Sequence, residues 1–273
     1  MITLYIVSTL FLIIVDNINM LVKNIFKLKN LKFSALILLS ACIENAPLDS
    51  LSPEGPYARS IDELFWLTFW IAVVIFVIVQ GALLLSVFVF KEKPDSPEPK
   101  QIHGNTKLEI LWTVIPVIIL AVIAVPTVRT IFDLANEPED ALKIEVIGHQ
   151  WWFEYKYPDY GITTANVLVI PADKPIRLEM WSNDVLHNYW VPKLNGKRYL
   201  VPGQTTYLNL HADSPNEFWA QCGEYCGLSH SKMRGRVLAL SESDFDAWVK
   251  NQQQNANKLE GNSLAAEGQQ LYL

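Results

Sequence analysis

Residues 219–233 read Trp219-Ala220-Gln221-Cys222-Gly223-Glu224-Tyr225-Cys226-Gly227-Leu228-Ser229-His230-Ser231-Lys232-Met233, and they hold two of the chain's three cysteines. Cys222 and Cys226 stand four residues apart, and His230 and Met233 follow at intervals of four and three. Two thiolates, an imidazole and a thioether form the ligand set that copper prefers, with the thioether as a weak axial ligand. Calcium and magnesium prefer oxygen ligands and fit this set poorly. The stretch therefore predicts a transition-metal site.

Two thiolates this close in sequence could bind one metal ion or bridge a pair of ions. Gly223 and Gly227 give the loop backbone the freedom that bridging needs. A pair of copper ions also requires a second imidazole from another part of the fold. The best candidate is His187, which lies upstream of the loop across strand-like sequence.

The residues alone leave three interpretations of the cysteine pair open. Two cysteines in an oxidising compartment usually form a disulfide. A tetrahedral site of cysteine and histidine could equally hold zinc. The methionine in register with the cysteines and the second histidine favour copper.

Two long apolar segments precede this region, at residues 64–90 and 110–130. The first contains no charged side chain, and the second contains only Arg129 near its end. Because a helix rises about 1.5 Å per residue, either segment is long enough to cross a hydrocarbon core of about 30 Å. Pro116 and Pro126 lie inside the second segment, which is tolerated in membrane helices. We expect a transmembrane hairpin.

The distribution of basic residues predicts how this hairpin is oriented. The linker at residues 91–109 carries four lysines, whereas residues 42–63 carry Arg59 as their only basic side chain. Basic loops usually stay on the cytoplasmic side. We therefore expect residues 91–109 in the cytoplasm, and residues 42–63 and the C-terminal domain in the periplasm or on the outer face.

The first 41 residues are typical of a bacterial secretory signal. A basic region with four lysines precedes a short apolar core, and the core ends in Leu39-Ser40-Ala41-Cys42. This ending is similar to a lipobox and predicts that Cys42 is the lipidated first residue of the mature chain. The alternative is that Cys42 is an ordinary buried thiol near a signal anchor. Translation could start at Met20, and otherwise residues 2–15 would form an extra apolar segment ahead of the signal.

Residues 141–240 predict a small all-β domain. Residues 143–147, 177–181 and 206–210 alternate in polarity, and turn residues separate such runs. This spacing is typical of a sandwich or barrel of about 100 residues. Residues 241–257 predict a terminal helix that Ser243 could cap. Residues 258–273 predict a polar tail.

Four sequence signatures together resemble subunit II of the haem-copper cytochrome c oxidases. They are Gly148-His149-Gln150-Trp151-Trp152, Asp184-Val185-Leu186-His187, Val201-Pro202-Gly203 and the cysteine stretch with His230 and Met233. The resemblance implies a membrane hairpin followed by a cupredoxin-like Greek-key β-barrel. It also implies a binuclear copper centre, CuA, with the side-chain ligands His187, Cys222, Cys226, His230 and Met233.

The resemblance implies roles for three further residues. Glu224 would supply a backbone carbonyl to one copper, and its carboxylate would reach a magnesium ion at the interface with subunit I. Trp151 matches the surface tryptophan that receives the electron from cytochrome c. Asp184 would form part of the surface on which cytochrome c docks. One departure is Tyr199, which stands where the family commonly has an aspartate, and it leaves the magnesium region in doubt.

The function that the resemblance implies is electron transfer within an enzyme complex. Cytochrome c would reduce the copper centre, and haem in subunit I would then receive the electron for oxygen reduction coupled to proton pumping. The implied partners are cytochrome c, subunits I and III and the bacterial plasma membrane, with no nucleic acid. The net charge of −6 is compatible with a basic donor. Competing hypotheses are a membrane-tethered copper chaperone, a quinol oxidase subunit and a structural subunit with a disulfide.

Overall fold

The computed structural model describes residues 46–91, 97–98, 101, 103–254, 264 and 268. The chain divides into the unit Met1–Ala46 and the unit Pro47–Leu273, and every element described below belongs to the second. The expected signal segment at 1–41 and the lipidation of Cys42 lie outside the described residues. Most of the expected tail at 258–273 does as well.

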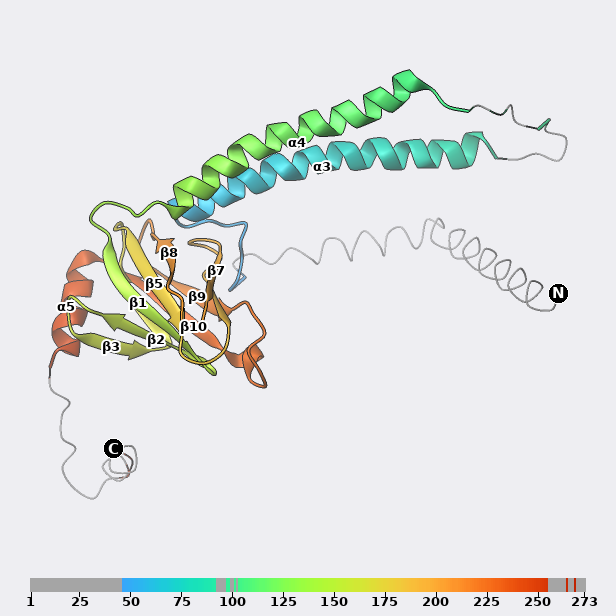
Figure 1. Cartoon of the computed structure of the whole chain (residues 1–273). Coiled ribbons are helices and arrows are strands. Elements are labelled where there is room, and N and C mark those ends of the chain that lie inside the picture. Colours follow the sequence, from blue (N-terminus) through green and yellow to red (C-terminus); the bar gives the residue numbers. More distant parts are fainter. Residues whose placement is uncertain are drawn as a thin grey trace, which may run out of the picture. The chain divides into compact units, whose positions relative to one another are not determined.

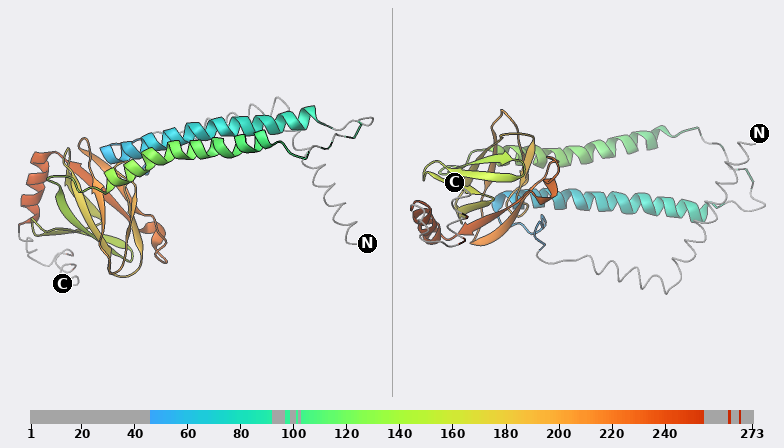
Figure 2. Two further views of the ribbon diagram at one scale, coloured as in Figure 1. Left: turned by 45° about the horizontal axis from the view of Figure 1, so that its top comes forward. Right: turned by 90° about the horizontal axis from the view of Figure 1, so that it is seen from below.

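Two helices, α3 (Pro56–Val89) and α4 (Thr106–Ala135), correspond to the two apolar segments. They pack against each other and run side by side (Figures 1 and 2). Their most apolar stretches have mean hydropathies of 2.8 and 2.6, and none of these residues is buried inside the protein. Such side chains need an apolar surrounding outside the chain, as a bilayer supplies.

Both helices are longer than the apolar runs that predicted them. Pro56 begins α3 because its missing N–H and fixed φ suit the first turn, so the helix starts before the apolar run that begins at residue 64. The side chain of Asn105 caps α4 by accepting hydrogen bonds from the N–H groups of Lys107 and Leu108. Polar and mixed turns extend each helix beyond the hydrophobic boundary, and α4 continues past the expected end at residue 130.

The remainder forms two packed β-sheets, each with five strands (Figure 1). One sheet has the order β3-β2-β1-β5-β8 and the other β4-β10-β9-β6-β7. Two helices followed by this cupredoxin-like β-sandwich confirm the predicted fold class. The strands are β1 (Leu142–His149), β2 (Trp152–Tyr157), β3 (Ile162–Ala165), β4 (Val167–Pro171), β5 (Ile176–Ser182), β6 (His187–Trp190), β7 (Lys197–Leu200), β8 (Thr206–Leu210), β9 (Asn216–Cys222) and β10 (Arg234–Leu240).

The terminal helix α5 (Glu242–Gln252) closes one end of the sandwich. Ser241 caps it by accepting a hydrogen bond from the N–H of Asp244, so the expected capping by Ser243 is wrong. Phe245 and Val249 are buried against the sheets. The helix ends at Gln252 rather than 257, and residues 255–257 lie outside the described part of the chain.

Strand register brings the sequence-predicted site together at one end of the second sheet. Cys222 at the end of β9 is paired with Tyr189 of the antiparallel strand β6. His187 is two residues before Tyr189, so it extends past Cys222 toward the loop that follows. That loop returns as β10, where Arg234 pairs with Gln221. The start of β6 and the loop at residues 223–233 therefore meet.

Candidate metal centre

The loop between β9 and β10 is fixed at its base by backbone hydrogen bonds. The N–H of Cys222 donates to the carbonyl of Met233 at 3.0 Å, which closes the loop. The N–H of Gly223 donates to the carbonyl of Asn188 at 3.1 Å, which ties the loop to β6. A short 3-10 helix, His230–Lys232, then returns the chain toward the cysteines. The loop is therefore a constrained scaffold for the side chains it carries.

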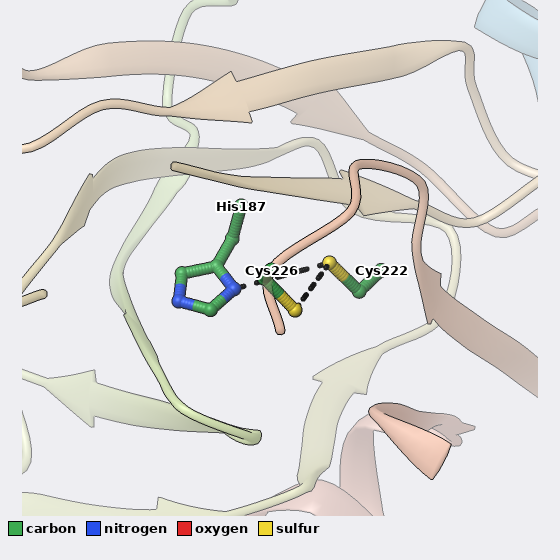
Figure 3. Close-up of side chains that lie close together, drawn as sticks. All are labelled: His187, Cys222 and Cys226. Carbon is green, nitrogen blue, oxygen red and sulfur yellow. Dashed lines mark hydrogen bonds between the residues drawn. The ribbon is translucent and has the colours of Figure 1, made fainter. Parts of the chain in front are cut away.

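His187, Cys222 and Cys226 form a compact group of possible metal ligands (Figure 3). The Sγ atoms of the two cysteines lie 3.8 Å apart, and Cys222 Sγ lies 3.9 Å from Nδ1 of His187. One ligand atom from each residue lies within 4.8 Å of the others. Such spacing allows all three atoms to contact one metal ion, and both sulfurs to contact a second.

The two cysteines are buried as free thiols. Their sulfur atoms are much farther apart than the ~2.05 Å of a disulfide bond. His187 and Cys222 are 0% exposed and Cys226 is 3% exposed. This environment excludes water from the space between the ligand atoms.

His230 and Met233 bring two further possible ligand atoms close to Cys226. Nδ1 of His230 lies 3.5 Å from Cys226 Sγ, and Sδ of Met233 lies 3.7 Å from the same atom. The backbone carbonyl of Glu224 lies 3.2 Å from Cys222 Sγ. The structure thus brings together every residue that the sequence placed around the metal.

Asp184 holds the ring of His187 in one orientation. Its Oδ1 lies 2.8 Å from Nε2 of His187, so the other ring nitrogen, Nδ1, faces the sulfur of Cys222. Partial burial raises the pKa of Asp184, but hydrogen bonds from His187 and from the N–H groups of Val185 and Gln150 outweigh it and lower the pKa. A carboxylate that orients a ligating histidine is a common arrangement in metal sites. Asp184 therefore lies at the protein surface and also contacts His187 of the candidate metal centre.

The two thiols of the metal-free protein differ in acidity. Burial raises the pKa of Cys222, but hydrogen bonds from His187 and from the backbone N–H of Asn188 lower it by more. The pKa of Cys222 is therefore below its ordinary value. Burial and the nearby Cys222 thiolate both raise the pKa of Cys226. The pair therefore carries one negative charge more readily than two, and a cation in the site would favour the second ionisation.

Gln150 and Trp151 connect the site to the turn after β1. The side-chain amide of Gln150 and the indole N–H of Trp151 both donate to the carbonyl of Cys226, at 2.8 and 3.1 Å. The backbone N–H of Gln150 donates to Oδ2 of Asp184 at 2.7 Å. Sequence reasoning assigned no role to Gln150, although it stands beside Trp151 in one of the quoted signatures.

Two glycines permit the close packing of this region. A Cβ atom at Gly148 would lie 2.8 Å from the ring of His187, so only glycine lets β1 approach the histidine. Gly227 has a φ of +114°, which other residues rarely adopt. Sequence reasoning missed Gly148, and a glycine inside a strand was the available signal.

Within the part of the chain that the structure describes, no group of possible magnesium ligands surrounds Glu224. Among the described residues, the only group of three or more possible ligands is His187 with the two cysteines. Tyr199 is exposed on β7, opposite Asn188 of β6, and supplies no carboxylate.

Comparisons with known proteins identify the family. The model of the transmembrane domain of cytochrome c oxidase subunit II matches residues 49–130, and the model of its periplasmic domain matches residues 161–239. Cytochrome c oxidase subunit 2 of Alkalihalophilus pseudofirmus is 35% identical over 243 residues, which cover 86% of this chain and 71% of that protein. This chain belongs to the subunit II family of haem-copper oxidases.

Other relatives of this chain are subunits of quinol oxidases. Quinol oxidase subunit 2 of Bacillus anthracis is 33% identical over 236 residues, which cover 84% of this chain and 80% of that protein. The crystal structure of the periplasmic domain of subunit II of cytochrome oxidase of Bradyrhizobium japonicum is 25% identical, with a TM-score of 0.41, and covers 44% of this chain and 96% of that domain. The family members include both cytochrome c and quinol oxidase subunits.

Membership settles the broad role and placement of the chain. It is a subunit of an oxidoreductase complex and associates with the other subunits of a haem-copper terminal oxidase. It is a membrane protein in which the helices α3 and α4 precede an extracellular β-domain.

Proposed function

We propose that this chain is the subunit of a cytochrome c oxidase that carries a binuclear copper centre, CuA. It accepts electrons from cytochrome c and passes them to haem in subunit I. There oxygen is reduced to water and protons are pumped. The observation that carries the proposal is the buried group of His187, Cys222 and Cys226, with His230 and Met233 beside it.

The chemistry of this donor set fits copper. Two thiolates, two imidazoles and one thioether are soft or borderline ligands, which select copper over calcium or magnesium. Each cysteine has its own histidine at 3.5 to 3.9 Å, so the donors are arranged in two similar halves. This near-symmetry supports a pair of ions bridged by sulfur rather than a single zinc ion. Bound at these residues, the copper pair would supply a one-electron redox centre.

The chain's own residues would keep such a centre fixed and dry. The loop is anchored by backbone bonds to Met233 and Asn188, and Asp184 fixes the ring of His187. Ligands that do not move when the charge changes lower the cost of reorganisation during electron transfer. Burial and these outer contacts would also tune the redox potential.

The surface around the loop supports docking of a protein donor at this end of the domain. Tyr225 is 73% exposed and Leu228 is 94% exposed, and both belong to the ligand loop. Val185 and Leu186 are exposed beside Asp184. Exposed apolar side chains that gather at one place usually mark an interaction site. Trp151, half-buried and bonded to Cys226, would receive the electron, and Asp184 would contribute to docking.

The proposal extends to the surroundings of the complex. The chain would lie in the bacterial plasma membrane with subunits I and III, and its β-domain would face the periplasm or the outer side. The carboxylate of Glu224 would join oxygen ligands of subunit I in holding a magnesium ion, which prefers such donors. Tyr199 would not take part, because a phenol replaces the expected carboxylate.

The quinol oxidase relatives make the reductant the central question. The copper-ligand set supports cytochrome c, since a quinol releases electrons without a copper centre at the donor surface. Cytochrome c oxidase and quinol oxidase subunits share this fold, so the fold cannot distinguish them. The copper content of the chain can.

The experiment measures copper in the full chain, purified in detergent and reduced before loading. We expect two copper ions per chain and an EPR spectrum in which one unpaired electron is shared by both nuclei. A Cys226→Ser variant should lose this shared signal, whereas Ser231→Ala, a change at an exposed side chain of the same loop, should keep it. One labile Cu(I) ion per chain would favour a copper chaperone, and the absence of copper would favour a quinol oxidase subunit. Either outcome would reject the proposal.

A further inference from the structure

Gln150 lies in the turn between β1 and β2 and bonds to two separate parts of the candidate metal centre. Its side-chain amide donates to the carbonyl of Cys226 at 2.8 Å, and its backbone N–H donates to Oδ2 of Asp184 at 2.7 Å. Asp184 in turn contacts Nε2 of His187 at the start of β6. A residue that is not itself a possible metal ligand therefore connects β6 to the loop at residues 223–233.

The two bonds of Gln150 reach different halves of the donor set. Asp184 acts on the half that contains His187 and Cys222, whose Nδ1 and Sγ atoms lie 3.9 Å apart. Cys226 belongs to the other half, in which Nδ1 of His230 lies 3.5 Å from its sulfur. The halves meet at the two sulfur atoms, which are 3.8 Å apart. Their relative position therefore depends on what fixes the loop against β6.

The carbonyl of Cys226 is held by side chains rather than by the backbone. The backbone hydrogen bonds that tie the loop to the strands lie at its base. Among the described residues, no backbone N–H donates to the Cys226 carbonyl, which accepts instead from the side chains of Gln150 and Trp151. A Cβ atom at Gly227 would lie 3.0 Å from Nε2 of Gln150, so this amide packs directly against the loop backbone.

The exposure of Gln150 separates a positioning role from a role in the core. Gln150 is exposed to solvent, where a glutamine amide can donate to water. Its amide donates instead to a residue whose side chain is only 3% exposed, Cys226. Substitutions at exposed positions usually change the stability of a domain very little. A change at Gln150 should therefore release the loop without unfolding the β-domain.

We propose that Gln150 is a positioning residue that fixes the loop at residues 223–233 relative to His187 and so sets the spacing of the two thiols. The consequence for copper rests on the proposed function. Holding the carbonyl of Cys226 fixes the backbone from which its sulfur extends, and holding Asp184 fixes the ring of His187. Groups that hydrogen-bond around metal ligands orient the ligands and tune the metal.

The first test uses the metal-free full chain in detergent, so it requires no copper. Hydrogen–deuterium exchange, measured by mass spectrometry, reports how often residues 223–233 open. Gln150→Asn keeps an amide but is one methylene shorter, so it cannot maintain the contact with Cys226. We expect exchange in the loop to be about fivefold faster in this variant, the ratio that the loss of one hydrogen bond produces. Exchange in β1 and β5 should stay unchanged, which shows that the β-domain remains folded.

Gln221→Asn is the matched control for this measurement. Gln221 stands beside Cys222 in the sequence, and within the described part of the chain its side chain forms no hydrogen bond. Exchange in the loop should therefore match that of the unmodified chain. Unchanged exchange in the Gln150 variant would overturn the proposal. Equal acceleration in both variants would also overturn it, because any shortened glutamine near the cysteines would then loosen the loop.

The second test loads the same chains with copper and separates this inference from the proposed function. If the unmodified chain binds two copper ions, the Gln150 variant should bind two as well, with a changed hyperfine pattern in the EPR spectrum and a shifted redox potential. An unchanged spectrum and potential would overturn the role of Gln150 and leave the copper proposal intact. An unmodified chain without copper would reject the proposed function, and exchange in the metal-free loop would still decide whether Gln150 positions it.

Discussion

The indole N–H of Trp151 donates a hydrogen bond to the backbone carbonyl of Cys226 at 3.1 Å. One hydrogen bond therefore joins a half-buried aromatic ring to a buried cysteine of the candidate metal centre. Gln150 donates to the same carbonyl at 2.8 Å, which holds the two segments in register. The contact gives Trp151 a direct covalent and hydrogen-bonded route to the sulfur of Cys226.

Replacing Trp151 with leucine is expected to slow reduction by cytochrome c. The change removes both the ring and the hydrogen bond, and we expect a loss of about tenfold or more, or ~1.4 kcal/mol in the barrier. Stopped-flow reduction of the copper-loaded complex measures this rate. Trp151→Phe keeps a ring without the N–H and should be intermediate. An unchanged rate in the leucine variant, with an unchanged copper spectrum, would remove Trp151 from the route.

Asp184→Asn separates two roles of this carboxylate. If Asp184 orients His187, the variant should bind copper about 10–100-fold more weakly, as is typical when a partner of a metal-ligating histidine is lost. If it serves only in docking, copper affinity stays the same and only the salt-dependent association with cytochrome c changes. Asp173→Asn, a change at an acid whose side chain is 89% exposed, is the control. The 2.8 Å contact with His187 predicts the first result.

Met233→Leu is expected to leave copper bound and to change its redox potential. Leucine has nearly the same volume, so the buried side chain can be replaced at a cost below about 1.5 kcal/mol. The thioether is a weak axial ligand that influences the potential more than the affinity. Redox titration of the copper signal measures the shift. Complete loss of copper from a folded variant would contradict the axial assignment.

Copper binding to this chain is expected to strengthen as the pH rises. Burial and the Cys222 thiolate raise the pKa of Cys226, so this thiol is still protonated in the metal-free protein near neutral pH. Copper must displace that proton, and a lower proton concentration favours the exchange. Affinity should therefore increase from about pH 6 to pH 9, and binding should release protons into a weakly buffered solution. Affinity that does not vary over this range would show that both thiols ionise before copper arrives.

The candidate metal loop could be predicted from sequence because its possible ligands are local. Cys222, Cys226, His230 and Met233 lie within one segment, and the methionine in register favoured a copper site over the disulfide that the cysteine spacing alone suggests. His187 was the candidate for a second imidazole, but its distance from Cys222 could not be predicted because it depends on how β6 pairs with β9. The hydrogen bond from the N–H of Gln150 to Asp184 could not be predicted from the sequence, because it joins two turns that no short-range pattern connects.

The extent of the two helices beyond their apolar runs could not be predicted for a different physical reason. The hydrophobic runs marked where a bilayer would cover the helices, but the helical backbone continues beyond that depth. Residues 56–63 are helical because Pro56 suits a first turn and because Arg59 is held by an ion pair with Asp213 of the β-domain. The partner is more than a hundred positions away in the sequence, so no local signal reports it.

Asn209 is expected to be a main determinant of stability where α4 meets the β-domain. Its amide nitrogen donates to the carbonyls of Leu134 and Asn136 at 3.1 and 2.7 Å, and its Oδ1 accepts from Arg177 at 2.8 Å. These bonds satisfy helix-end carbonyls that would otherwise lack a partner. Asn209 is fully buried, so its loss leaves several polar groups unpaired.

Asn209→Ala should lower the free energy of unfolding by about 2–4 kcal/mol, since each buried group left unsatisfied costs about 1–3 kcal/mol. Thermal unfolding of the full chain in detergent, followed by circular dichroism, measures the change. Asn216→Ala is the control, because the exposed side chain of Asn216 donates to the carboxylate of Glu54 and accepts from the N–H of Glu217, and neither bond reaches α4. The control variant should lower the free energy of unfolding by no more than about 0.5 kcal/mol. Equal losses in the two variants would mean that the bonds to α4 contribute no more than a surface contact.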